Sequence, residues 1–104
     1  MNSFDEREKS FEKKFVMDAE LQFKVNAKRN RYLGEWVAIK MGKNNEEKEN
    51  YVKEVIKADF IEPGDEDVFK KIKSDFESAS IKIQDSEIRN QMKITLDRAK
   101  KDFI

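Results

Sequence analysis

The sequence contains no cysteine and no histidine. Without cysteine the chain forms no disulfide bond and no thiolate metal site, a pattern that suits the cytosol. Without histidine it lacks the commonest general base and the commonest nitrogen ligand for metals. Its three glycines stand singly at Gly34, Gly42 and Gly64, and none precedes the Lys-Ser or Lys-Thr pair of a Walker-type phosphate loop. We therefore expect a protein that is not an enzyme and that holds no metal and no cofactor.

The sequence also contains few helix-breaking residues, no excess of one charge and no long apolar run. One proline and three glycines interrupt 104 residues, of which 42% are charged and 38% hydrophobic, and this composition is typical of long solvated helices. The 22 basic residues balance the 22 acidic ones, so no net field favours nucleic acid or a membrane surface. No run reaches the roughly 20 apolar residues that span a bilayer, and the first residues do not resemble a secretory signal. We expect a cytoplasmic protein with no nucleic-acid partner and no direct membrane insertion.

Residues 1–17 carry a narrow aromatic stripe on an otherwise charged helix. At 100° per residue, Phe4, Phe11 and Phe15 lie within about 40° of one another, and charged side chains cover most of the remaining surface. Ser3 and Glu6 form a capping-box pattern that can start this helix. An isolated helix of this length is marginal in water, so we expect this arm to be disordered or frayed in the free protein and to become ordered on binding.

A second apolar stripe follows with a different phase. It is offset from the first on the same helical wheel, and it comprises Leu21, Val25, Tyr32, Trp36 and Ile39. One core therefore need not hold both stripes. The residues alone leave two interpretations open for the first stripe: it packs back on the rest of the chain as part of a structural rod, or it is a separate functional arm.

Residues 18–104 have the periodicity of four amphipathic helices joined by short loops. The expected helices cover residues 19–41, 45–62, 65–77 and 85–103. Short connections make neighbouring helices antiparallel. The predicted fold class is therefore all-α, a four-helix antiparallel bundle over residues 18–104 with an N-terminal arm, residues 1–17, that extends or frays from the first helix.

Local signals support these boundaries. Gly42 tolerates the left-handed conformation that commonly ends a helix, and Asn44 can cap the next helix together with Glu47. Gly34, inside the first helix, indicates the close approach of another helix. The face of the second helix that is expected to point inward comprises Val52, Val55, Ile56, Asp59 and Phe60.

Two charged clusters have alternative interpretations. Asp65, Glu66 and Asp67 stand at a helix start, where helix capping is favoured over a cation site because the alternating oxygen ligands of a calcium loop are missing. A basic group is either a solvated helix face or a surface for phosphate or an acidic partner, and it comprises Lys24, Lys28, Arg29, Arg31 and Lys40.

Arg29 lies on the same side of the first helix as Tyr32 and Trp36. These three residues form a candidate ligand pocket if the arginine supports a cavity. Alternatively, the arginine only lays its aliphatic stem over the core.

Several ordered motifs carry a resemblance to a known family. They are Phe4-Asp5 with Arg7-Glu8, Phe11-Glu12 with Lys14-Phe15, Asp18 with Glu20-Leu21, Phe23-Lys24, Ala27-Lys28-Arg29-Asn30, Leu33-Gly34 with Trp36, Ala58-Asp59-Phe60 and Gly64-Asp65-Glu66-Asp67-Val68-Phe69. Over nearly its whole length the chain resembles the alphaproteobacterial ATPase inhibitor family, the zeta subunit of the F-type ATP synthase. Lys28 is a mild departure, since arginine is expected there in many relatives. The resemblance implies a four-helix fold and so agrees with the periodicity.

The resemblance also implies inhibition of ATP hydrolysis by the F-type ATP synthase. The N-terminal helix would wedge into an interface between catalytic subunits of the head, touch the central stalk and block hydrolytic rotation, while the bundle stays outside as a stopper. Phe4, Phe11 and Phe15 would anchor the arm, and ion pairs or hydrogen bonds would come from Asp5, Arg7, Glu8, Glu12 and Lys14. The free protein would be a monomer, and the complex would place it in the cytoplasm at the periphery of the inner membrane.

Two other functions stay open, both with weak or no inhibitory activity. The bundle can act as a nucleotide-binding module, for which the sequence offers only the basic group and the indole of Trp36. It can also act as a helical adaptor for another complex. A saturable nucleotide titration would identify the first, and unchanged partner binding after removal of residues 1–17 would identify the second.

Overall fold

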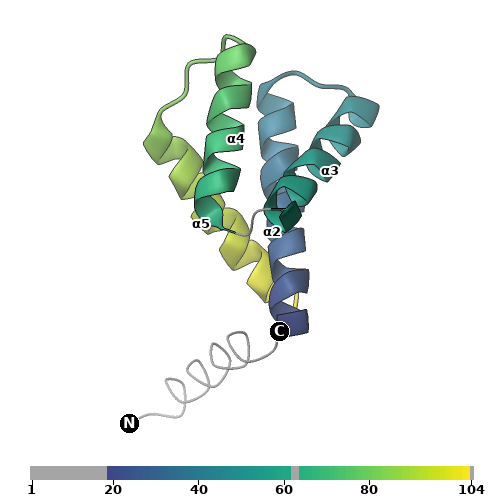
Figure 1. Ribbon diagram of the computed structural model, residues 1–104. Helices are drawn as coiled ribbons and strands as arrows, with labels where there is room; N and C mark the ends of the chain where they lie inside the picture. The colour runs from purple at the N-terminus through teal and green to yellow at the C-terminus, as the bar shows by residue number, and fades with distance from the viewer. Residues whose placement is uncertain (1–18, 62–63, 104) are drawn as a thin grey trace.

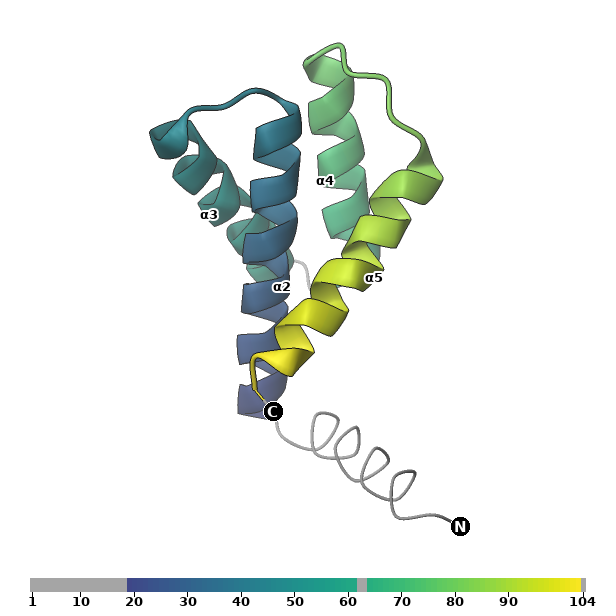
Figure 2. The same ribbon diagram turned by 180° about the vertical axis from the view of Figure 1, so that it is seen from behind.

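The computed structural model describes residues 19–61 and 64–103, which form an all-α bundle (Figure 1). The predicted arm lies outside these residues, so its boundary at residue 17 stays a prediction. The described part contains four helices and no strand, and the helices are α2 (Ala19–Lys40), α3 (Asn45–Ile61), α4 (Asp65–Ser78) and α5 (Asp85–Lys101). Consecutive helices run in opposite directions in both views (Figures 1 and 2). The predicted four-helix antiparallel bundle is confirmed.

The turn between α2 and α3 follows the predicted signals. Gly42 has a φ of 71°, and the Lys43 amide donates to the Ala38 carbonyl at 3.0 Å, which is the six-residue closure of a Schellman motif. The Asn44 amide donates to the Glu47 carboxylate at 3.0 Å, and the Glu47 amide donates to the Asn44 side-chain carbonyl at 2.8 Å. These reciprocal bonds make a capping box, so α3 begins where the sequence predicts.

The main core fills the space between the four helices. Its buried members are Leu33, Val37, Ala38, Tyr51, Val55, Val68, Phe69, Ile72, Phe76, Ile88 and Met92. The helices α2 and α3 approach closely at Gly34, where an added Cβ would lie 3.1 Å from the Val52 Cα. The prediction that Gly34 permits a close helix contact is therefore confirmed.

A smaller apolar cluster closes the end of the bundle at which α2 begins and α5 ends. Val25 and Ala99 are buried there, with Leu21, Leu96 and Phe103 packed against them. The helices α2 and α5 converge at this end and diverge toward their other ends (Figure 2). The described part of the chain therefore begins at this end of the bundle.

Two apolar residues of the predicted helix faces are exposed, and one of them, Phe60, was expected to point inward. Ile39, a member of the second apolar stripe, lies in the last turn of α2 and is 66% exposed. Phe60 is 69% exposed, and it follows Asp59 near the end of α3. Around the helix axis, the Phe60 side chain points about 140° away from that of Val55, which is in the centre of the buried face. The predicted inward face of this helix should therefore have ended at Asp59. In the described part of the chain, no helix is long and apolar enough to cross a membrane.

Candidate functional site

The arm predicted to bind a partner lies outside the described residues. This applies to all eight predicted contact residues, which are Phe4, Asp5, Arg7, Glu8, Phe11, Glu12, Lys14 and Phe15. Their roles stay predictions. The structure instead describes the bundle to which the arm is attached. Three of its features are relevant to function: a buried polar cluster around Arg29, a cluster of cations around Tyr32 and an apolar pocket.

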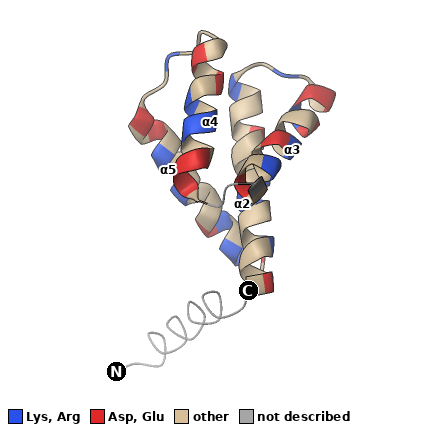
Figure 3. Ribbon diagram, viewed as in Figure 1, with Lys and Arg blue, Asp and Glu red and all other residues tan. Residues whose placement is uncertain are grey.

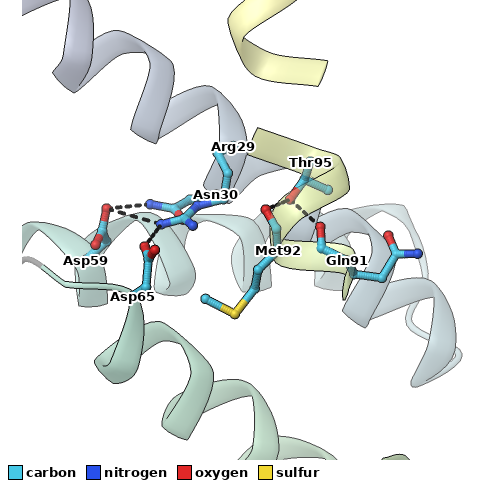
Figure 4. Close-up of polar contacts among 7 residues, drawn as sticks. All are labelled: Arg29, Asn30, Asp59, Asp65, Gln91, Met92 and Thr95. Carbon is cyan, nitrogen blue, oxygen red and sulfur yellow. Dashed lines mark hydrogen bonds and ion pairs between the residues drawn. The ribbon is translucent and has the colours of Figure 1, made fainter. Parts of the chain in front are cut away.

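The buried polar cluster connects three helices (Figure 4). Arg29 and Asn30 of α2 are only 2% and 1% exposed. The Arg29 Nε donates to the Asn30 Oδ1 at 2.7 Å, and the Asn30 Nδ2 donates to the Asp59 Oδ2 of α3 at 2.8 Å. The Arg29 Nη2 lies 3.1 Å from the Asp65 Oδ1 at the start of α4. The cluster therefore fixes α2 to the junction between α3 and α4.

Arg29 is thus a structural cation whose Nε and Nη2 already face acceptors within the bundle. A buried guanidinium is strongly unfavourable unless carboxylates and other acceptors surround it. The structure leaves no described buried side-chain nitrogen or oxygen without a hydrogen-bond partner. Little of this guanidinium remains to bind the phosphate of a ligand, and the arginine does more than lay its stem over the core.

Tyr32 makes a separate cluster on the side of α2 that faces α5. The Arg98 Cζ lies 3.8 Å from the centre of the tyrosine ring, and the Lys28 Nζ lies 5.8 Å from it. The tyrosine hydroxyl donates a hydrogen bond to Asp102. This bond, with smaller contributions from burial and from the charge of Asp102, raises the pKa of Tyr32, and the charge of Arg98 opposes the rise.

Trp36, the third residue of the predicted ligand pocket, packs on α4. Its ring meets that of Phe76 edge to face, with centroids 5.8 Å apart and an interplanar angle of 83°. The Lys40 Nζ lies 5.8 Å from the indole centre. Arg29 and Trp36 therefore contact opposite ends of α4, at Asp65 and Phe76, whereas Tyr32 contacts α5. The structure does not bring the three side chains together around one cavity.

An apolar pocket of about 460 Å³ lies between α2 and α3. It is lined by Phe23, Asn26, Ala27, Asn30, Lys53, Ile56, Lys57, Asp59 and Phe60. The rings of Phe23 and Phe60 meet edge to face with centroids 6.1 Å apart, although these side chains are 55% and 69% exposed. The pocket was not predicted from the sequence, because Phe60 was expected to lie in the core.

The basic group is largely paired within the bundle. Arg31 donates two bonds to the Glu49 carboxylate at 3.2 and 3.3 Å and lowers the pKa of Glu49. Lys24 and Lys40 pair with Glu20 and Glu87 at 3.4 and 3.8 Å. Figure 3 shows basic and acidic residues mixed along all four helices. This pattern is that of a solvated helix surface.

The acidic residues at the start of α4 are also used within the bundle. Asp65 pairs with Arg29, and the Glu66 carboxylate lies 2.7 Å from Arg89 Nη2. All three acidic residues stand in the first turn of α4, where they complement the helix dipole. Among the described residues, no group of aspartates and glutamates is arranged to hold a metal ion.

The chain matches a known protein family. The family model described as ATPase inhibitor subunit zeta matches residues 1–102. The matched range includes both the predicted arm and all four helices. A comparison with curated proteins finds no match.

Proposed function

Because the chain belongs to the ATPase inhibitor subunit zeta family, we propose that it inhibits the F-type ATP synthase by placing residues 1–17 in an interface between catalytic subunits of the head. The family supports the general role of an ATP synthase inhibitor. The wedge, its contacts with the central stalk and its position at the cytoplasmic periphery of the inner membrane are parts of the proposal.

The arm acts by coupled folding and binding. A helix that lies in a preformed groove presents one apolar stripe to the groove wall, and Phe4, Phe11 and Phe15 form such a stripe in the sequence. Large aromatic side chains in the centre of an interface commonly contribute most of its binding free energy. The charged contacts, which set the register, come from Asp5, Arg7, Glu8, Glu12 and Lys14.

The bundle gives the arm a rigid base. The helix α2, which directly follows the arm, is held to α3 and α4 by the buried cluster around Arg29. It is also held to α5 by Val25 and Ala99. Rotation of the central stalk against an arm anchored in this way must displace the whole bundle or pull the arm out of its groove, and this resistance blocks hydrolytic rotation.

The observation that carries this proposal is the family match, which extends over the arm as well as the bundle. The test measures ATP hydrolysis by the cognate synthase head with the full-length protein and with the double variant Phe11→Ser and Phe15→Ser. We expect inhibition by the first protein and its loss in the second. The control is Ile39→Ser, which changes an exposed apolar residue of the bundle and should inhibit fully.

Two results would contradict the proposal. If the native protein does not inhibit a competent head, the inhibitory role is wrong for this chain. If the double variant inhibits as well as the native protein, the aromatic stripe is not the inhibitory element, although the chain remains an inhibitor.

A further inference from the structure

We propose that the pocket between α2 and α3 is a second contact surface, which binds an acidic amphipathic helix of the ATP synthase head. This inference rests on the proposed function for the identity of the partner. The shape and charge of the pocket specify the chemistry of the helix that it binds, and they do not involve the arm.

The pocket has the features of an interface that is uncovered in the free chain. Four large apolar side chains are exposed among the described residues, and two of them, Phe23 and Phe60, contact each other. Isolated exposed apolar residues are common, whereas contiguous ones mark interaction sites. The half-buried Ile56 and Ala27 extend the same surface. Its volume of about 460 Å³ lies within the roughly 300–1,000 Å³ of typical ligand sites.

Two lysines determine the charge of the preferred partner. Lys53 and Lys57 line the pocket from α3 and are exposed, and neither makes an ion pair or hydrogen bond with another described residue. The other lysines that flank α2 differ, since Lys24 pairs with Glu20 and Lys28 lies over Tyr32. The carboxylate of Asp59, on the inner wall, already accepts from Asn30. The available charge at the pocket is therefore positive.

The spacing of the lysines favours a helical partner. Residues 53 and 57 stand one turn apart on α3, about 6 Å along its axis. Two carboxylates at positions i and i+4 of a partner helix repeat at the same interval. Such a helix can bury bulky apolar side chains against Phe23 and Phe60 while its acidic residues meet the lysines. A two-fold contact with a second copy of this chain is less favourable, because it would bring the lysines of both copies together.

The experiment measures binding separately from inhibition. Because the chain has no cysteine, the exposed Lys101 can be replaced by a single cysteine that carries a fluorophore. The fluorescence anisotropy of the labelled full chain is then measured as the cognate head is added. We expect Phe60→Ser to weaken binding at least tenfold, since it removes a central aromatic contact. The double variant Lys53→Glu and Lys57→Glu should slow association about tenfold at low salt.

Matched controls come from the same helix surfaces. Ile39→Ser removes an equally exposed apolar side chain outside the pocket, and the double variant Lys70→Glu and Lys93→Glu reverses two exposed lysines on α4 and α5. Both should bind the head as the native chain does. Because Phe60 is exposed, its replacement should leave the fold intact. Circular dichroism of each variant checks this point.

Measurements of inhibition distinguish the role of the pocket from that of the arm. If the pocket only adds affinity, Phe60→Ser shifts the concentration for half-maximal inhibition and leaves the maximal inhibition unchanged. Loss of the maximum in this variant would overturn the assignment of the pocket as a second contact. If the native chain binds through the pocket without inhibiting, the second contact stands and the proposed inhibitory mechanism fails.

Three further results would overturn the inference. Unchanged binding by both pocket variants would mean that the head does not contact this surface. Tighter binding by Phe60→Ser would mean that residues 4–15 of the same chain cover the pocket and compete with the head. A change in the association state of the free protein, measured by sedimentation, would assign the pocket to a second copy.

Discussion

Asn30 and Asp59 lie 29 residues apart in the chain, yet the Asn30 amide donates a 2.8 Å hydrogen bond to the Asp59 carboxylate. Asn30 in turn accepts from Arg29, whose guanidinium reaches Asp65. Because all three helices of this cluster depend on one another, its loss should affect the whole bundle. A buried polar network of this kind is favourable only while every member has its partner.

Replacement of Arg29 by alanine should lower the free energy of unfolding by about 3 kcal/mol. This value is at the lower end of the usual range for a buried pair, because Asp65 is 67% exposed and water screens that side of the contact. Urea unfolding followed by circular dichroism measures the change. The control is Arg31→Ala. The side chains of its pair with Glu49 are 39% and 47% exposed, so solvent screens the pair and its loss should change the free energy of unfolding much less. Equal effects of the two variants would mean that the buried cluster has no special structural role.

Gly34→Ala should destabilise the bundle by about 1 kcal/mol or more, although alanine is the better helix former by a similar amount. The added Cβ would lie 3.1 Å from the Val52 Cα and 3.3 Å from its Cγ2. A backbone atom of a buried residue cannot move away without separating α2 from α3. Thermal unfolding tests the sign, and a melting temperature above that of the native chain would show that the two helices separate easily.

Tyr51 should make the stability fall at high pH. Its burial, and next its hydrogen bond to Asp75, raise the pKa of Tyr51 above the ordinary value of about 10. Above that pH the unfolded chain releases a proton that the native chain retains, so the free energy of unfolding decreases as pH rises. The contribution of this group is fully present below about pH 10 and decreases by up to about 1.4 kcal/mol per pH unit above it.

The variant Tyr51→Phe provides the comparison for this prediction. Lysine side chains also titrate above pH 10, but they do so in both proteins, and the difference in unfolding free energy isolates the tyrosine. We expect the native chain to lose stability more steeply than the variant in urea unfolding at pH 9 to 11. Parallel curves would mean that Tyr51 titrates normally in the native state.

The sequence predicted those features that depend on neighbouring residues. Gly42 and the pair of Asn44 and Glu47 act within one turn, so their residue types determine the helix boundaries directly. Gly34 was also predictable, since glycine weakens a helix and is best tolerated inside one where another backbone packs closely against it. The all-α class followed from periodicity together with the scarcity of proline and glycine.

The contacts between distant residues could not be predicted in the same way. Arg29 shares a helical face with Tyr32 and Trp36, but the crossing of α2 with its neighbours places Tyr32 against α5 and the other two side chains at opposite ends of α4. The pocket at Phe23 and Phe60 depends on where α3 ends relative to the first turns of α2. Periodicity specifies which face a residue occupies, whereas the divergence of helices determines whether that face is covered.

Removal of residues 1–17 should abolish inhibition and leave the bundle folded. The described residues form both apolar clusters from positions 21–103, and α2 keeps its contacts with the three other helices through Arg29 and Val25. We therefore expect the truncated chain to retain its helical circular dichroism and to unfold within about 1 kcal/mol of the full chain. It should still bind the head weakly through the pocket, because that surface lies wholly within the bundle. A loss of several kcal/mol would instead mean that the stripe of Phe4, Phe11 and Phe15 packs on the bundle as part of a structural rod, and the loss of inhibition would then reflect unfolding rather than removal of the wedge.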